Sequence, residues 1–129
     1  MLSAFSRMLL VEGLDDWVML GALSMGFIGR DPSPDEFILE SRAALEPLLR
    51  EGLTVMGDLS ATGGGFRVWG SSVEECLDRF EAAYRDDPTD QRGLWSFGMW
   101  LSLTQKGADV AKKCIDADPD PLGIGDLRD

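Results

Sequence analysis

Residues 94–103 have the sequence LWSFGMWLSL, and this stretch decides the fold that we predict. Side chains two positions apart in a strand point to the same side of a sheet. We therefore expect these residues to form the central strand of a sheet and to bury its apolar odd positions, which are Trp95, Phe97, Met99, Leu101 and Leu103. Thr104 comes next and is expected to cap a final helix. The apolar positions of that helix are Ala108, Ala111, Cys114 and Ile115.

A hairpin is predicted upstream of this strand. Residues 53–59 (LTVMGDL) and residues 66–69 (FRVW) have the composition of strands, and the segment 62–65 (TGGG) between them is typical of a turn. Together with residues 94–103, they predict an antiparallel sheet of three strands. The positions expected to face the core are Leu53, Val55 and Leu59 in the first strand and Phe66 and Val68 in the second.

The clearest helix signal lies at Ser33. Pro34 occupies the first helical position, and Glu36 stands three residues after Ser33, which is the spacing of a capping box. Pro47 lacks a backbone N–H and should bend this helix or divide it into two. Gly52 is expected to end it.

Two further helices are predicted from capping residues and apolar periodicity. Asp15 and Asp16 precede an apolar stretch that should form a core helix ending near the glycines at positions 26 and 29. Ser72 and Glu75 again have capping-box spacing, and Asp87 ends that helix. The apolar stripe of the second helix comprises Val73, Cys76, Leu77, Phe80 and Tyr84.

Composition limits the classes of function. The chain has 129 residues, which suits one domain, and we expect this domain over residues 1–115 with an acidic, flexible tail over 116–129. The formal net charge is −11, which argues against a surface for nucleic acid or an anionic membrane. Histidine is absent, so the commonest general base is missing. We expect a protein that is not an enzyme.

No cofactor or metal site is predicted. The best candidate is the series Asp116, Asp118 and Asp120, which matches the first three ligand positions of a calcium loop. Pro121 stands where that loop needs glycine, and Leu127 where it needs a bidentate glutamate. We therefore expect a solvated tail here.

The cysteines and the N-terminus indicate the compartment. Cys76 and Cys114 lie on apolar stripes and are expected to be free thiols rather than a disulfide framework. Arg7 interrupts the apolar stretch at the N-terminus, which is unlike a signal peptide. The longest apolar run, residues 17–28, is too short to span a bilayer. We expect a cytoplasmic protein.

A candidate partner-binding site follows from the tryptophans. If the strands alternate as predicted, Trp69 and Trp100 share the face opposite the core. The helix that begins at Ser72 either covers them or leaves an exposed aromatic patch. In the second case, the patch would act together with the acids of that helix, which are Glu74, Glu75, Asp78 and Glu81.

Two segments resemble bacterial winged-helix domains. Residues 48–55 (LLREGLTV) are similar to the end of the second core helix and the first wing strand of those domains. Residues 100–108 (WLSLTQKGA) are similar to their closing strand and C-terminal helix. The pattern Trp-Leu-x-x-Thr-x-x-Gly, with Gly65-Phe66 and Trp69, resembles small uncharacterised actinobacterial proteins more closely. The resemblance implies an α+β, winged-helix-like fold, with helices on a small three-stranded antiparallel sheet and a helical insertion in the wing.

Three functions remain open at this point. The first is a non-catalytic acidic protein-interaction module, such as an immunity protein or antitoxin that binds a basic partner. The alternative is a winged-helix transcriptional regulator that binds DNA. The segment 33–51 is predominantly acidic, which disfavours contact with phosphate. The third is an enzyme or small-ligand binder with an internal pocket.

Overall fold

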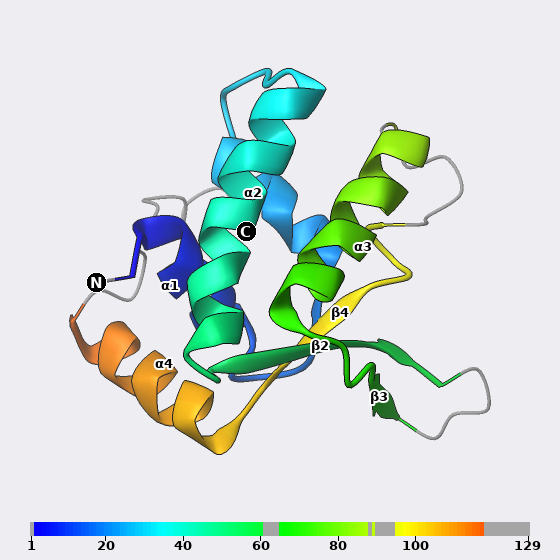
Figure 1. Cartoon of the computed structure of the whole chain (residues 1–129). Helices are drawn as coiled ribbons and strands as arrows, with labels where there is room; N and C mark the ends of the chain where they lie inside the picture. The colour runs from blue at the N-terminus through cyan, green and yellow to red at the C-terminus, as the bar shows by residue number, and fades with distance from the viewer. Residues whose placement is uncertain (1, 61–64, 88, 90–94, 118–129) are drawn as a thin grey trace.

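The computed structural model describes residues 2–60, 65–87, 89 and 95–117, and it has an α+β fold. α2 and α3 stand on one side of an antiparallel sheet, and α1 and α4 lie beside it (Figure 1). The helices are α1 (Ala4–Glu12), the 3₁₀ helix η1 (Leu20–Phe27), α2 (Pro34–Arg50), α3 (Val73–Asp86) and α4 (Gln105–Ala117). The strands are β1 (Val18–Met19), β2 (Thr54–Leu59), β3 (Phe66–Val68) and β4 (Trp100–Leu103).

The sheet has four strands in the order β1-β4-β2-β3, and neighbouring strands are antiparallel. The expected hairpin of β2 and β3 is confirmed, and β4 lies inside the sheet as expected. The prediction of three strands is wrong, because Val18 pairs with Leu101 and adds β1 at the edge. The predicted helix after Asp16 is therefore replaced by this strand and by η1, whose Leu20, Leu23 and Phe27 are buried as expected of a core element.

β4 is shorter than predicted. Residues 95–99 form a turn, and only Trp100–Leu103 are extended. Trp95 and Met99 are buried, but Phe97 is 63% exposed, so its predicted place in the core is wrong. The physical reason is that this segment bonds to η1 rather than to a strand: the backbone N–H groups of Leu20 and Gly21 donate to the carbonyls of Met99 and Ser96.

The predicted faces of β2 and β3 also need correction. Met56 and Thr54 are buried under the helices, whereas Val55 is only half-buried and Val68 is 54% exposed. In β2 the adjacent residues Val55 and Met56 are both apolar, so alternation did not single out one face. Leu53 is buried as expected, although it precedes the strand.

Both capping boxes are confirmed. The side chains of Ser33 and Ser72 accept from the backbone of Glu36 and Glu75, and each glutamate accepts in return from the serine N–H. α2 continues through Pro47 as one helix, and Gly52 follows its end with a φ of +69°. This left-handed conformation favours glycine.

Thr104 caps α4 as predicted, and a glycine lets this helix approach β2. Thr104 Oγ1 accepts from the N–H of Gly107 at 3.0 Å. A Cβ at Gly107 would lie 1.8 Å from the carbonyl oxygen of Leu53, so only glycine fits there. The expected domain boundary after residue 115 falls inside α4; residues 118–129, with the rest of the candidate calcium loop, lie outside the described residues.

An aromatic cluster forms the core between α2, α3 and the turn before β4. Phe37 stacks on Tyr84 with ring centroids 4.6 Å apart, and Trp95 meets both rings edge-on. Phe80 is fully buried beside them. The apolar stripe predicted for α3 is thus confirmed as the face that packs on α2.

Candidate partner-binding surface

Two adjacent rows of residues cross the sheet and point to opposite faces. In one row, Val18 pairs with Leu101 and Leu101 with Met56, and all three are at most 4% exposed. In the next row, Met19 pairs with Trp100, Trp100 with Gly57, and Gly57 with Val68. Cross-strand partners share a face and successive residues alternate. The first row therefore faces the helices, and the second faces away from them.

Trp69 and Trp100, which were expected on one face, lie on opposite faces. Trp69 continues the helix-facing row, since its N–H donates to the carbonyl of Met56. Its indole Nε1 donates to Asp58 Oδ2 at 3.0 Å, and the Arg79 guanidinium of α3 lies 3.6 Å from the ring centre. Trp69 is therefore packed under α3, whereas Trp100 belongs to the opposite face.

Asp58 is held in its charged form where β2 pairs with the edge strand β3. Arg67 donates to Asp58 Oδ1 at 2.9 Å, and Trp69 donates to Oδ2. These two hydrogen bonds, the one from Arg67 first, lower the pKa of the Asp58 carboxyl from its ordinary value of 3.8. The carboxylate thus joins β2 to β3 and fixes the Trp69 ring.

Most of the acids predicted to meet a partner already have partners within the fold. Arg42 of α2 lies within 4.0 Å of Glu74, Asp78 and Glu81 of α3. Arg50 also pairs with Glu74. Glu75 closes the α3 capping box, and the Ser72 backbone N–H lowers the pKa of its carboxyl. Glu74, Asp78 and Glu81 thus join α3 to α2, which the sequence alone could not reveal because their partners lie on another helix.

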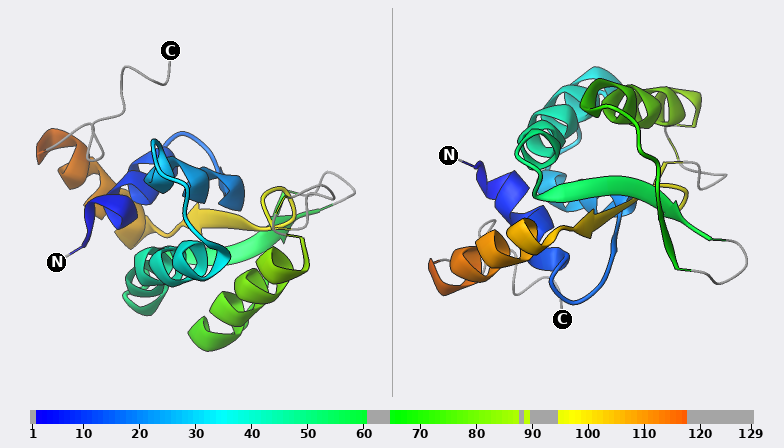
Figure 2. Two further views of the ribbon diagram at one scale, coloured as in Figure 1. Left: turned by 90° about the horizontal axis from the view of Figure 1, so that it is seen from above. Right: turned by 60° about the horizontal axis from the view of Figure 1, so that its bottom comes forward.

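The side of the sheet away from α2 and α3 carries an apolar surface. We call it the open face and define it as Trp17, Met19, Val55, Leu59, Phe66, Val68 and Trp100. The right-hand view of Figure 2 shows α2 and α3 above the sheet, with β2, β3 and β4 below them. Trp17 is 40% exposed, and its ring lies 6.0 Å from that of Phe66. Among the described helices, none is drawn across this face.

Trp17 lines two hollows at the β1 edge of the open face. One, of about 270 Å³, is lined by Trp17, Met19 and Trp100 together with the acids Glu12 and Asp16. The other, of about 280 Å³, is lined by Trp17, Ser102, Asp15 and Asp16 among others. Aromatic rings and carboxylates therefore share the walls of both depressions.

Trp17 and Met19 were missed as candidate site residues. Asp15 and Asp16 suggested a helix start, so these side chains were assigned to a core helix. The available signal was the sequence Asp-Asp-Trp-Val-Met, in which acids adjoin an alternating apolar segment. A strand of two residues depends on its partner, so local sequence carries little information about it.

The described residues offer few other kinds of site. They contain no group of three or more His, Cys, Asp or Glu side chains placed to hold a metal ion. No helix among them has both the length and the apolar character needed to cross a membrane. Both cysteines are free: Cys76 is buried, and Cys114 is partly exposed.

No protein-family model, curated protein or solved structure matches this chain.

Proposed function

We propose that the protein is a non-catalytic interaction module that binds a basic protein partner through the open face. One observation carries this proposal: the hollow beside Trp17 combines two indole rings, Trp17 and Trp100, with the carboxylates of Glu12 and Asp16. Such a wall suits a lysine or arginine side chain, because a cation is attracted both by carboxylates and by aromatic faces.

The rest of the open face would supply short-range apolar contact. Val68 is 54% exposed, and Met19 and Trp100 are partly exposed in the same row. Gly57 lies between Trp100 and Val68 in this row but is itself buried, with the Arg67 carbonyl and the Phe66 ring beside it, so the contact would come from the flanking side chains. The net charge of −11 would accelerate encounter with a basic partner, whereas the aromatic anchors would slow dissociation.

The winged-helix assignment, the immunity or antitoxin role and the cytoplasmic location belong to this proposal as well. The order α2, β2, β3 and the passage from β4 into α4 support a winged-helix-like arrangement, with α3 as the insertion after the hairpin. An antitoxin or immunity protein that masks a nuclease-like toxin would cover a basic surface, and the β1 edge of the open face offers acids and aromatic anchors for that purpose.

A selection experiment tests the proposal directly. Peptides are selected on the full chain from a displayed random library, and we expect enrichment of sequences with Lys or Arg beside an apolar residue. Trp17→Ala should weaken binding of such a peptide about tenfold, equivalent to about 1.4 kcal/mol. Leu39→Ala is the matched control, because Leu39 is 71% exposed on α2 and should leave affinity unchanged.

Two further variants test how much charge contributes to binding of the partner. Asp16→Asn should slow association and reduce its salt dependence, whereas Asp78→Asn on α3 should change neither. Equal effects of the two substitutions would contradict the open face as the site. Enrichment of acidic peptides, or sub-micromolar binding of a labelled DNA duplex with a steep salt dependence, would contradict the basic-protein partner and favour a DNA-binding regulator.

A further inference from the structure

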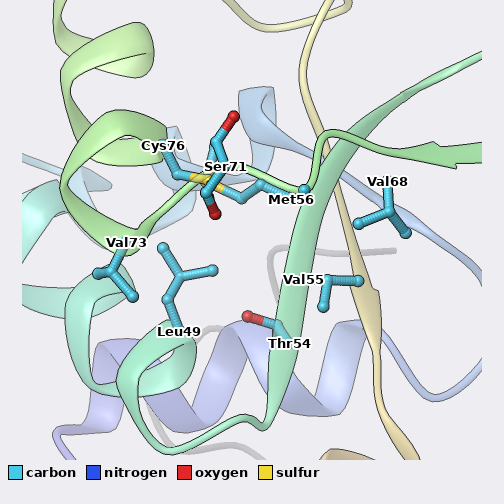
Figure 3. Close-up of a pocket in the computed structure, with 9 residues that line it drawn as sticks. Leu49, Thr54, Val55, Met56, Val68, Ser71, Val73 and Cys76 are labelled. Atoms are coloured by element: carbon cyan, nitrogen blue, oxygen red, sulfur yellow. The ribbon is translucent and has the colours of Figure 1, made fainter.

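A separate cavity lies on the helix-facing side of the sheet, below the start of α3. Its volume is about 230 Å³, and its nine lining residues include no charged side chain. Figure 3 shows Leu49, Thr54, Met56, Val73 and Cys76 around the space, with Val55 and Val68 pointing away from it. Val55 and Val68 also line the cavity, and both belong to the open face, whereas the other lining residues do not.

One polar atom in this apolar wall lacks a partner. Thr54 is only 3% exposed, and no described residue forms a hydrogen bond with its Oγ1. In Figure 3 this hydroxyl points from β2 into the space toward Leu49. A buried hydroxyl without a hydrogen bond costs about 1–3 kcal/mol, so a molecule in the cavity that satisfied it would be favoured.

The cysteine in the wall strengthens the preference for a neutral occupant. Cys76 is 5% exposed, and its Sγ lies 3.9 Å from the carbonyl oxygen of Ser71. Burial raises the pKa of the Cys76 thiol, so the sulfur stays neutral near physiological pH. Together with Met56, it gives one side of the cavity a soft, polarisable surface.

We propose that this cavity binds a small neutral molecule, mainly apolar, with one hydroxyl or carbonyl group that hydrogen-bonds to Thr54 Oγ1. Its size limits the ligand: an apolar cavity of about 150 Å³ holds benzene, and drug-sized ligands need about 300 Å³ or more. A substituted benzene ring or a short branched alcohol is the matching class. This site is distinct from the proposed partner surface, because seven of its nine lining residues, Thr54 among them, lie outside the open face.

The test uses p-cresol and toluene, which differ by one hydroxyl group. Each is titrated into the full chain while the methyl NMR signals of Leu49, Met56 and Val73 are followed. We expect both probes to shift these signals, and p-cresol to bind about fivefold more tightly, which corresponds to one hydrogen bond of about 1 kcal/mol.

Two variants identify the atom responsible. Thr54→Val keeps the shape of the side chain and should abolish the preference for p-cresol, because the p-cresol hydroxyl then has no partner, while leaving toluene affinity unchanged. Ser41→Ala is the control, because Ser41 is also buried with an unpaired hydroxyl but does not line the cavity, and it should keep the fivefold preference. Equal affinities of the two probes for the unmodified chain would overturn the proposal. So would a preference that survives Thr54→Val, or methyl signals that fail to move.

Discussion

Two neighbouring residues of β4, Trp100 and Leu101, show how differently the two faces of the sheet are used. Leu101 is 1% exposed and lies in a row with Val18 and Met56 beneath the helices. Trp100 is only partly buried and lies in a row with Met19 and Val68 on the open face. Both rows are apolar, yet only one is covered by described helices. The covered apolar row therefore stabilises the fold, whereas we propose that the uncovered apolar row binds a partner.

The largest difference between the faces should appear in stability. Leu101→Ala removes a fully buried side chain and should lower the free energy of unfolding by about 3 kcal/mol through lost burial and a residual cavity. Chemical denaturation followed by circular dichroism measures this. Val68→Ser on the open face should change the same quantity by no more than about 0.5 kcal/mol. Similar losses in the two variants would mean that the open face is part of the core.

A smaller effect is expected from the charges that hold the covered side together. Arg42 is shared by three acids of α3, so Arg42→Gln should lower stability by about 1 kcal/mol. Raising the salt concentration should reduce the difference from the unmodified protein, because salt screens exposed charges. Arg30→Gln is the control and should have the weaker effect, because Arg30 has one ion pair, with Glu40, besides its contacts with the Phe27 ring and the Gly26 carbonyl.

The smallest expected effect is on the pH dependence of stability, and it involves Asp58 beside the edge strand β3. The pKa of Asp58 is lower in the folded chain than its ordinary value of 3.8, because Arg67 and Trp69 donate to the carboxylate. The stability that the ionised Asp58 carboxylate adds to the folded chain is therefore fully present above pH 3.8. It is lost as the pH falls below that value through the lowered pKa. The Asp58→Asn variant should be less stable at neutral pH, and its free energy of unfolding should depend less on pH in this acidic range.

Acid titration of the two proteins, followed by tryptophan fluorescence, provides the comparison. Parallel stability curves for Asp58→Asn and the unmodified chain would show that this carboxyl does not contribute to acid sensitivity. The Trp69 environment is the expected reporter, because its indole donates to the same carboxylate.

The sequence predicted those parts of the fold that depend on local signals. Ser33 with Glu36 and Ser72 with Glu75 are capping pairs three residues apart, and both helices begin where these pairs indicate. The hairpin of β2 and β3 follows from a glycine-rich sequence between two apolar segments, most of which (62–64) lies outside the described residues. These elements were accessible because the interacting residues are close in the chain.

The missed features depend on residues far apart in the chain. β1 exists because Val18 pairs with Leu101, and no local pattern distinguishes this from a helix. The acids of α3 looked available, but Asp78 meets Arg42 across a separation of 36 positions. Likewise, Trp69 and Trp100 were assigned to one face because the register between β3, β2 and β4 was unknown.

The NMR signals of the four tryptophan indole N–H groups test most directly whether a basic partner binds the open face. Trp17 and Trp100 lie on the open face, whereas Trp69 and Trp95 lie on the covered side, so the protein contains its own internal comparison. A basic peptide selected on the chain is titrated into ¹⁵N-labelled protein. We predict that the chemical shifts of the Trp17 and Trp100 indoles change, while those of Trp69 and Trp95 do not. Movement of the Trp69 signal with Trp17 and Trp100 unchanged would contradict it and would place the partner on the α3 side instead.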